Sequence, residues 1–107
     1  METNQRKSRR IQLQTKLEEI LGSKNVYFEP PENIKMKYPC IVYELGAGLR
    51  TPADNKKYLF SQGYSVTYIT KDPDTDIPDK LLELEYCTLE RPFVSENLHH
   101  WVFFLYY

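Results

Sequence analysis

Apolar residues recur along the chain with two periods, one typical of helices and the other of strands. The helical period is clearest in a stripe with the spacing i, i+4, i+7 and i+8, formed by Leu13, Leu17, Ile20 and Leu21. This spacing predicts a helix over about residues 5–21 that packs on a sheet and turns its polar side to water. Gly22 follows, at the place where a left-handed residue commonly ends a helix.

Strand-like runs occupy much of the remaining chain. Strands are expected at 26–28, 40–45, 58–70, 86–93 and 98–107, and a second, short helix is expected at about 77–84. The order α-β-β-β-α-β-β predicts an α+β fold class. We expect a single domain over residues 1–107, with one mainly antiparallel β-sheet and two helices packed on one face.

Alternation in the strand expected at 58–70 indicates which side of it is buried. The large residues Tyr64 and Tyr68 share one side, and the small polar residues Ser65 and Thr67 share the other. One face of this strand is therefore expected on the core.

The last expected strand differs because it is apolar on both sides. Val102 and Phe104 share one side, and Trp101, Phe103 and Leu105 share the other. We expect the Val102 side to pack against the helices. The Trp101 side is then a candidate contact with another subunit, because a soluble monomer rarely leaves large aromatic residues in water. The alternative is a strand that is covered on both faces within one chain.

An acidic segment precedes the second expected helix. Counting from Asp72, carboxylates fall at positions 1, 3, 5 and 12, as in a calcium-binding EF-hand loop, but Ile77 stands at position 6 where that loop needs glycine. We interpret the segment as the start of a helix, with Asp76 as its N-cap residue and Pro78 in the first turn. No metal site is expected here.

Other residues that could carry chemistry form no catalytic group. His99 and His100 are adjacent, so in a strand their rings point to opposite faces and cannot hold one metal ion together. The sequence has no G-x-S-x-G motif and no complete phosphate-binding glycine pattern. Cys40 and Cys87 lie in strand-like runs and are expected to be buried, reduced thiols. We therefore expect a protein that is not an enzyme and has no cofactor.

Composition excludes several classes of protein, and the distribution of charge adds a clue. The chain is 41% hydrophobic and 27% charged, which is unlike a disordered protein, and no apolar run approaches the roughly 20 residues of a membrane span. Its net charge of -1 argues against a generally basic nucleic-acid binder. Residues 1–24 nevertheless carry six basic and three acidic residues, whereas residues 72–90 carry one basic and seven acidic residues. This separation suits head-to-tail contacts between subunits that close into a ring.

The order and spacing of several segments resemble small tail-completion or tail-terminator proteins of long-tailed (siphovirus-type) bacteriophages. These segments are Val26–Asn33, Met36–Tyr43, Ala53–Lys56, Tyr64–Thr67, Asp72–Asp74, Ile77–Lys80, Leu84–Cys87, Asn97–His100, Val102–Phe103 and Tyr106–Tyr107. The resemblance covers about residues 20–107. It leaves the basic N-terminal arm, residues 1–10, unexplained.

The resemblance implies a virion structural protein that is found at the head-proximal end of the tail after assembly in the bacterial host cytoplasm. Proteins of this kind form a homo-oligomeric ring, usually a hexamer, that caps the tail tube and joins it to the head. Implied partners are the tail tube protein, head-completion or neck proteins, and DNA that passes through the ring without sequence-specific binding; no membrane is implied. The alternatives are a head–tail joining (neck) protein and, outside virion assembly, a small metal- or nucleic-acid-binding module.

A polar loop is expected at residues 46–57, between two strands. It carries Arg50, Lys56 and Lys57. Because long connections between good strands usually have a role, we expect this loop to be exposed and to line the hole of the ring or contact a neighbouring ring.

Overall fold

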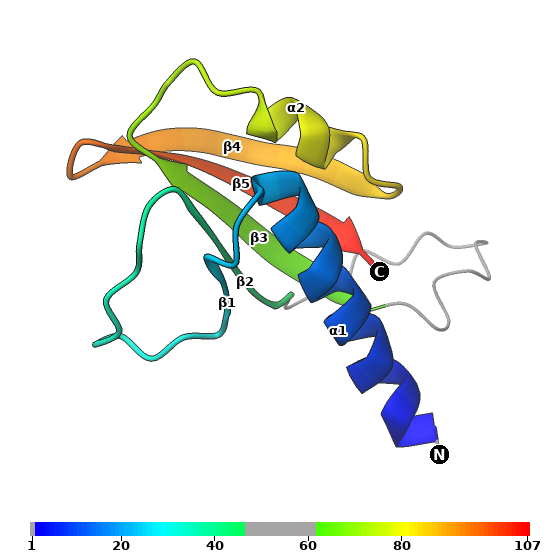
Figure 1. The fold of residues 1–107 in the computed structure, drawn as a ribbon. Helices are drawn as coiled ribbons and strands as arrows, with labels where there is room; N and C mark the ends of the chain where they lie inside the picture. Colours follow the sequence, from blue (N-terminus) through cyan, green and yellow to red (C-terminus); the bar gives the residue numbers. More distant parts are fainter. Residues whose placement is uncertain (1, 47–61) are drawn as a thin grey trace.

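A computed structural model describes residues 2–46 and 62–107, with side chains from Ser8 onward in the first range. Its elements follow the expected order α-β-β-β-α-β-β, and the α+β fold class is confirmed (Figure 1). They are α1 (Glu2–Leu21), β1 (Val26–Phe28), β2 (Cys40–Leu45), β3 (Gly63–Thr70), α2 (Ile77–Leu82), β4 (Cys87–Ser95) and β5 (Leu98–Tyr106). The strand expected at 58–70 begins at Gly63 within the described chain, and residues 58–61 lie outside it.

The five strands form one sheet in the order β1-β2-β3-β5-β4. β1 pairs with β2 in parallel, and the other three pairings are antiparallel. A tight turn at Glu96 and Asn97 joins β4 to β5, and both residues have positive φ values, 54° and 65°. Two successive positive φ values are typical of the type I′ turn, whose twist matches that of the strands it joins.

Both helices lie on the same face of the sheet (Figure 1). Leu13 and Leu17 from α1 and Leu81 from α2 are fully buried, and all three belong to one hydrophobic cluster with strand residues. The stripe expected on the first helix therefore packs on the sheet as predicted. The core-facing side expected for β3 is also confirmed, because Tyr64 and Tyr68 are buried.

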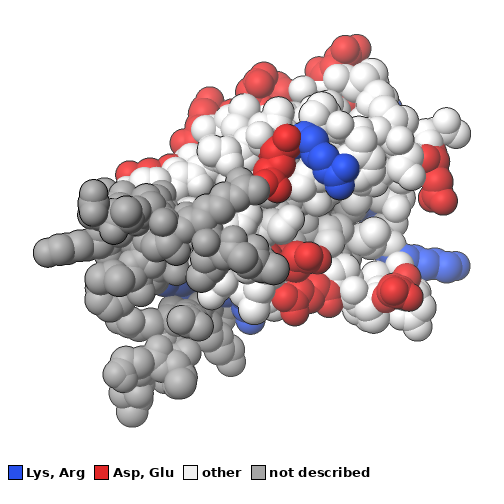
Figure 2. Space-filling model, turned by 180° about the vertical axis from the view of Figure 1, so that it is seen from behind, with Lys and Arg blue, Asp and Glu red and all other residues white. Residues whose placement is uncertain are grey.

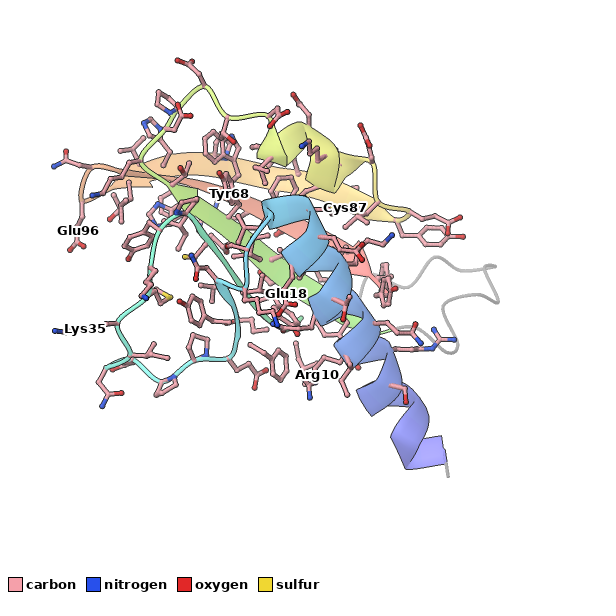
Figure 3. All side chains as sticks on the ribbon, viewed as in Figure 1. Arg10, Glu18, Lys35, Tyr68, Cys87 and Glu96 are labelled. Carbon is pink, nitrogen blue, oxygen red and sulfur yellow. The ribbon has the colours of Figure 1, made fainter. Side chains whose placement is uncertain are left out.

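A polar contact fixes α1 on the sheet. The buried Tyr43 hydroxyl donates a hydrogen bond to Gln14 Oε1 at 2.6 Å, and Gln14 Nε2 donates to the Val26 carbonyl at 3.0 Å. One turn earlier, the Arg10 guanidinium lies 4.5 Å from the centre of the Phe28 ring (Figure 3). Burial raises the pKa of Tyr43, and the nearby Arg10 opposes this rise. These contacts hold the helix at one position along the strands.

The N-terminal turns of α1 extend past the sheet (Figure 1). The helix begins at Glu2, so the expected basic arm of residues 1–10 is helical for nearly its whole length. From Ser8 onward, the first fully buried residue is Leu13. At the other end, Gly22 has a φ of 83°, and its N–H donates to the Glu18 carbonyl at 2.8 Å, which confirms the expected end of the helix.

Candidate interaction surface

Strand β5 turns its Trp101 side, rather than its Val102 side, toward the helices. The side chains of Phe103 and Leu105 are 0% and 1% exposed in the core, and the half-buried Trp101 stacks on Tyr68 at 5.7 Å. The expectation that these three β5 residues face another subunit is therefore wrong. The register explains why, since it aligns Phe103 with Val66 on the core-facing side of β3. Both sides of β5 are apolar, so its own pattern does not distinguish them.

The opposite side of the sheet carries no helix from the described part of the chain. Four side chains on this side are buried, namely Cys40, Ile69, Phe104 and Tyr106. The partly or fully exposed residues that make up the open face, as the term is used below, are Tyr27, Val42, Glu44, Ser65, Thr67, Thr88, Arg91, Phe93, His100 and Val102. Figure 2 shows this side of the molecule: acidic side chains line its upper border, further acidic side chains and a basic one stand nearer its middle, and uncharged atoms fill much of the described surface between them. A surface that mixes apolar and aromatic side chains with a few charged ones is a common composition for a protein–protein contact surface.

One cation stands within the open face. The Arg91 guanidinium lies 5.0 Å from the centre of the Phe93 ring, and that ring stacks on His100 at 4.5 Å with an interplanar angle of 11°. Phe93 remains 37% exposed. The three side chains thus pack on one another and leave part of the Phe93 ring exposed.

Both edges of the sheet are poorly suited to pairing with a further strand. β4 contains Pro92, which lacks an N–H, and its register shifts between Leu89 and Arg91. At the other edge β1 has only three residues, and the prolines Pro30 and Pro31 follow it closely. Prolines, irregular register and short length all disfavour strand addition at an edge. Addition of a further strand at either edge is therefore disfavoured.

Acidic residues gather around α2 and the β4–β5 hairpin. All of the carboxylate residues from 72 to 96 are exposed, namely Asp72, Asp74, Asp76, Asp79, Glu83, Glu85, Glu90 and Glu96. One of them, Asp76, forms an ion pair with Lys80 at 3.8 Å. The uneven charge of the sequence therefore becomes an acidic surface that lies away from the basic N-terminal turns of α1 (Figure 1).

Asp76 occupies the N-cap position of α2, but its side chain does not cap the helix. The neighbouring Thr75 instead accepts a hydrogen bond on Oγ1 from the Ile77 N–H at 3.2 Å. The same hydroxyl lies 3.2 Å from the Tyr68 hydroxyl. The expected capping role of Asp76 is thus wrong. The contact with the Tyr68 hydroxyl holds the Thr75 hydroxyl where it accepts the hydrogen bond from the Ile77 N–H.

The remaining residues chosen from the sequence divide into two groups. Arg50, Lys56 and Lys57 lie outside the described residues. Cys40 is buried as expected, Cys87 is half-buried, and burial raises the pKa of each thiol to about 11. These raised pKa values keep both thiols protonated and poorly reactive near neutral pH.

The two histidines point to opposite faces, as expected. His99 stacks near Trp101 on the helix side, with ring centres 5.9 Å apart, whereas His100 stacks on Phe93 on the open face. Within residues 2–46 and 62–107, no group of three or more His, Cys, Asp or Glu residues is placed to hold a metal ion.

Comparisons with protein-family models, with curated proteins and with solved structures give no match to this chain. Neither helix in the described ranges combines the length and the apolar character that crossing a membrane requires.

The sequence patterns did not reveal the open face. Arg91 and Phe93 stand two residues apart in β4, and His100 and Val102 have the same spacing in β5. Residues two apart in a strand point to the same side of the sheet, so this spacing in both strands of the hairpin could have predicted that the four side chains share a face.

Proposed function

We propose that this chain is a tail-terminator (tail-completion) protein of a long-tailed bacteriophage. In this proposal its copies form a ring, a hexamer by the resemblance, that caps the head-proximal end of the tail tube and joins the tube to the head. Its role in the virion is structural, and it uses neither a catalytic site nor a cofactor. DNA passes through the ring without being read.

The observation that carries this proposal is the half-covered sheet. Helices cover one face, whereas the open face presents Val42, Val102 and the edge of Phe93. The open face mixes these apolar groups with polar and charged side chains such as Thr67 and Arg91, which is the composition of many contacts between proteins. Because both edges of the sheet disfavour the addition of a further strand, a contact between proteins is more easily made through the open face. The order and spacing of segments over residues 20–107 supply the identity of the assembly.

The test uses the tail tube protein encoded in the same genome. Tube assembly is started with and without the purified chain, and tube lengths and ends are measured by negative-stain electron microscopy. The proposal expects shorter tubes with a ring at one end only. A Val102→Asp variant, checked for native circular dichroism, places a charge on the open face and should cap fewer tubes than the unchanged chain.

Two outcomes would contradict the proposal. Tubes of unchanged length with bare ends would show that the chain does not terminate them. Binding to the tail-proximal opening of isolated heads, without binding to tubes, would favour the head–tail joining (neck) alternative.

A further inference from the structure

We propose that the helix-covered side of the β4–β5 hairpin binds a basic, partly apolar segment of a partner protein. The contact surface, called the hairpin patch below, consists of Leu89, Pro92, Val94, His99 and Trp101. It lies on the other side of the sheet from the open face. The inference therefore goes beyond the proposed function and does not depend on it.

The strand register places all five side chains of the hairpin patch on one side of the sheet. The aligned pairs of the two strands are Leu89 with Phe103, Pro92 with Trp101, and Val94 with His99. Phe103 belongs to the core beneath the helices, and residues two apart in a strand point to the same side. The hairpin patch thus continues the core surface of the sheet toward the β4–β5 turn.

The two helices do not reach this part of the sheet. The end of the hairpin extends past both of them (Figure 1). Val94 is 62% exposed, which is the largest value among the large apolar side chains of the described ranges, and Leu89 is 41% exposed. Pro92 is exposed as well. Exposed apolar side chains that adjoin a core are the kind of surface that a partner covers.

Aromatic stacking holds the middle of the hairpin patch in place. The half-buried Trp101 ring stacks with Tyr68, with ring centres 5.7 Å apart, and with His99, with ring centres 5.9 Å apart. Tyr68 is itself buried, and its hydroxyl lies 3.2 Å from Thr75 Oγ1. Because these contacts order the rings before a partner arrives, binding requires little further ordering of this surface.

Carboxylates stand along the border of the hairpin patch. The Asp72 N–H donates a hydrogen bond to Thr70 Oγ1 at 3.1 Å, and Thr70 is aligned with His99 of the patch. The segment 71–76, which begins there and leads to α2 (Figure 1), carries three exposed aspartates, namely Asp72, Asp74 and Asp76. Glu96 is exposed in the turn at the end of the hairpin (Figure 3).

The chemistry of the partner follows from the charge and the apolar centre of this surface. Lys71 and Lys80 accompany the four carboxylates, and Lys80 pairs with Asp76 at 3.8 Å, so the border keeps a net charge of -2. It attracts a cationic surface and repels the phosphates of nucleic acid or anionic lipid. The exposed Val94 adds the need for a large apolar side chain. A protein segment in which lysine or arginine residues flank such a side chain meets both requirements.

The fluorescence of Trp101 reports on the hairpin patch directly, because it is the only tryptophan of the chain. The probe is an eight-residue synthetic peptide in which four lysines surround two leucines. Two control peptides carry glutamate in place of lysine, or serine in place of leucine. We expect the lysine–leucine peptide to change the emission of Trp101 and to bind at least about 5-fold more tightly than either control peptide. Its affinity should fall as the salt concentration rises.

The apolar centre is tested by Val94→Ser. The matched control is Ile34→Ser, which removes an exposed apolar side chain from the segment between β1 and β2. Both variants are checked for native circular dichroism. Val94→Ser should weaken binding of the lysine–leucine peptide at least about 3-fold, whereas Ile34→Ser should change it by less than about 2-fold.

The acidic border is tested by a variant that combines Asp74→Lys with Glu96→Lys. Its matched control, Glu19→Lys with Glu32→Lys, makes the same change in charge at exposed carboxylates on α1 and after β1. The border variant should bind the lysine–leucine peptide at least about 5-fold more weakly than the control does, and it should lose most of the salt dependence.

Several results would overturn the proposal. They are an unchanged Trp101 emission up to about 1 mM peptide, equal binding of the lysine and glutamate peptides, and a border variant or Val94→Ser that binds like its control. Emission that shifts with the concentration of the chain alone, and no longer does so in Val94→Ser, would show that a second copy covers the patch instead. Tighter binding of a single-stranded oligonucleotide would assign the patch to nucleic acid. None of these results bears on the proposed function, which is tested at Val102 on the open face.

Discussion

The hydrogen bond between Tyr43 and Gln14 offers a direct test of how α1 is held on the sheet. The Tyr43 side chain is fully buried, and its hydroxyl donates to Gln14 Oε1 at 2.6 Å. Gln14 also donates to the Val26 carbonyl, so this one side chain satisfies polar atoms on two strands. The variants that test this contact are Tyr43→Phe, Gln14→Leu and their combination.

The expected magnitudes follow from which polar atoms lose their partners. Tyr43→Phe removes a donor from Gln14, which is only partly buried, and should cost about 1 kcal/mol. Gln14→Leu leaves the buried Tyr43 hydroxyl and the Val26 carbonyl without that partner and should cost about 2 kcal/mol. The double variant should also cost about 2 kcal/mol rather than the sum, which corresponds to a coupling of about 1 kcal/mol.

The free energy of unfolding is measured by urea titration, followed by circular dichroism and by the fluorescence of Trp101. Gln12→Leu is the matched control, because Gln12 is exposed on the same helix, and it should change stability by less than about 0.5 kcal/mol. Additive costs in the double variant, or a control as damaging as Gln14→Leu, would refute the reasoning.

Three further predictions concern the cap of α2, the end of α1 and the thiols. Thr75→Ala should cost about 1 kcal/mol in urea titrations and Asp76→Ala less than about 0.5 kcal/mol; the reverse order would restore the aspartate as the cap. Gly22→Ala should lower the melting temperature at a cost of about 1 kcal/mol, because alanine disfavours a φ of 83°, and an unchanged melting temperature would contradict this. Cys40 and Cys87 should react slowly with a thiol reagent at pH 8 until the chain unfolds. Because burial raises both pKa values to about 11, their contribution to stability should fall as pH rises from about 9, where unfolded thiols ionise, toward 11; rapid labelling of the native chain would argue against this burial.

Local patterns predicted those parts of the fold that depend on one element at a time. The stripe of Leu13 and Leu17 has one apolar side, and the alternation of Tyr64 and Tyr68 has one large side, so each pattern indicates its buried face without knowledge of the neighbours. Strand β5 is different, because Phe103 and Phe104 are equally apolar. The face that receives the helices is then decided by pairing with β3, which lies about 35 residues earlier in the chain.

The parts of the candidate surface that could not be predicted depend on similarly distant contacts. Thr75 and Asp76 are both good capping residues, and the Tyr68 hydroxyl, contributed by β3, is what favours Thr75. The stack of Arg91, Phe93 and His100 needs the register of the hairpin, including its shift after Leu89. A sequence pattern gives the candidates in each case, but the selection among them comes from tertiary structure.

The position of β5 in the sheet also has a consequence for how the chain folds during synthesis. β3 obtains its second neighbour only from β5, which is the last strand along the sequence, and β4 pairs with β5 alone. Among the described elements, a nascent chain that ends before residue 98 has the two helices and strands β1–β3 but lacks β5, so only the β1-β2-β3 side of the sheet can pair. Because the pairing of β3 with β5 closes a long loop, we expect the complete sheet to form late and cooperatively, after residue 106 has left the ribosome.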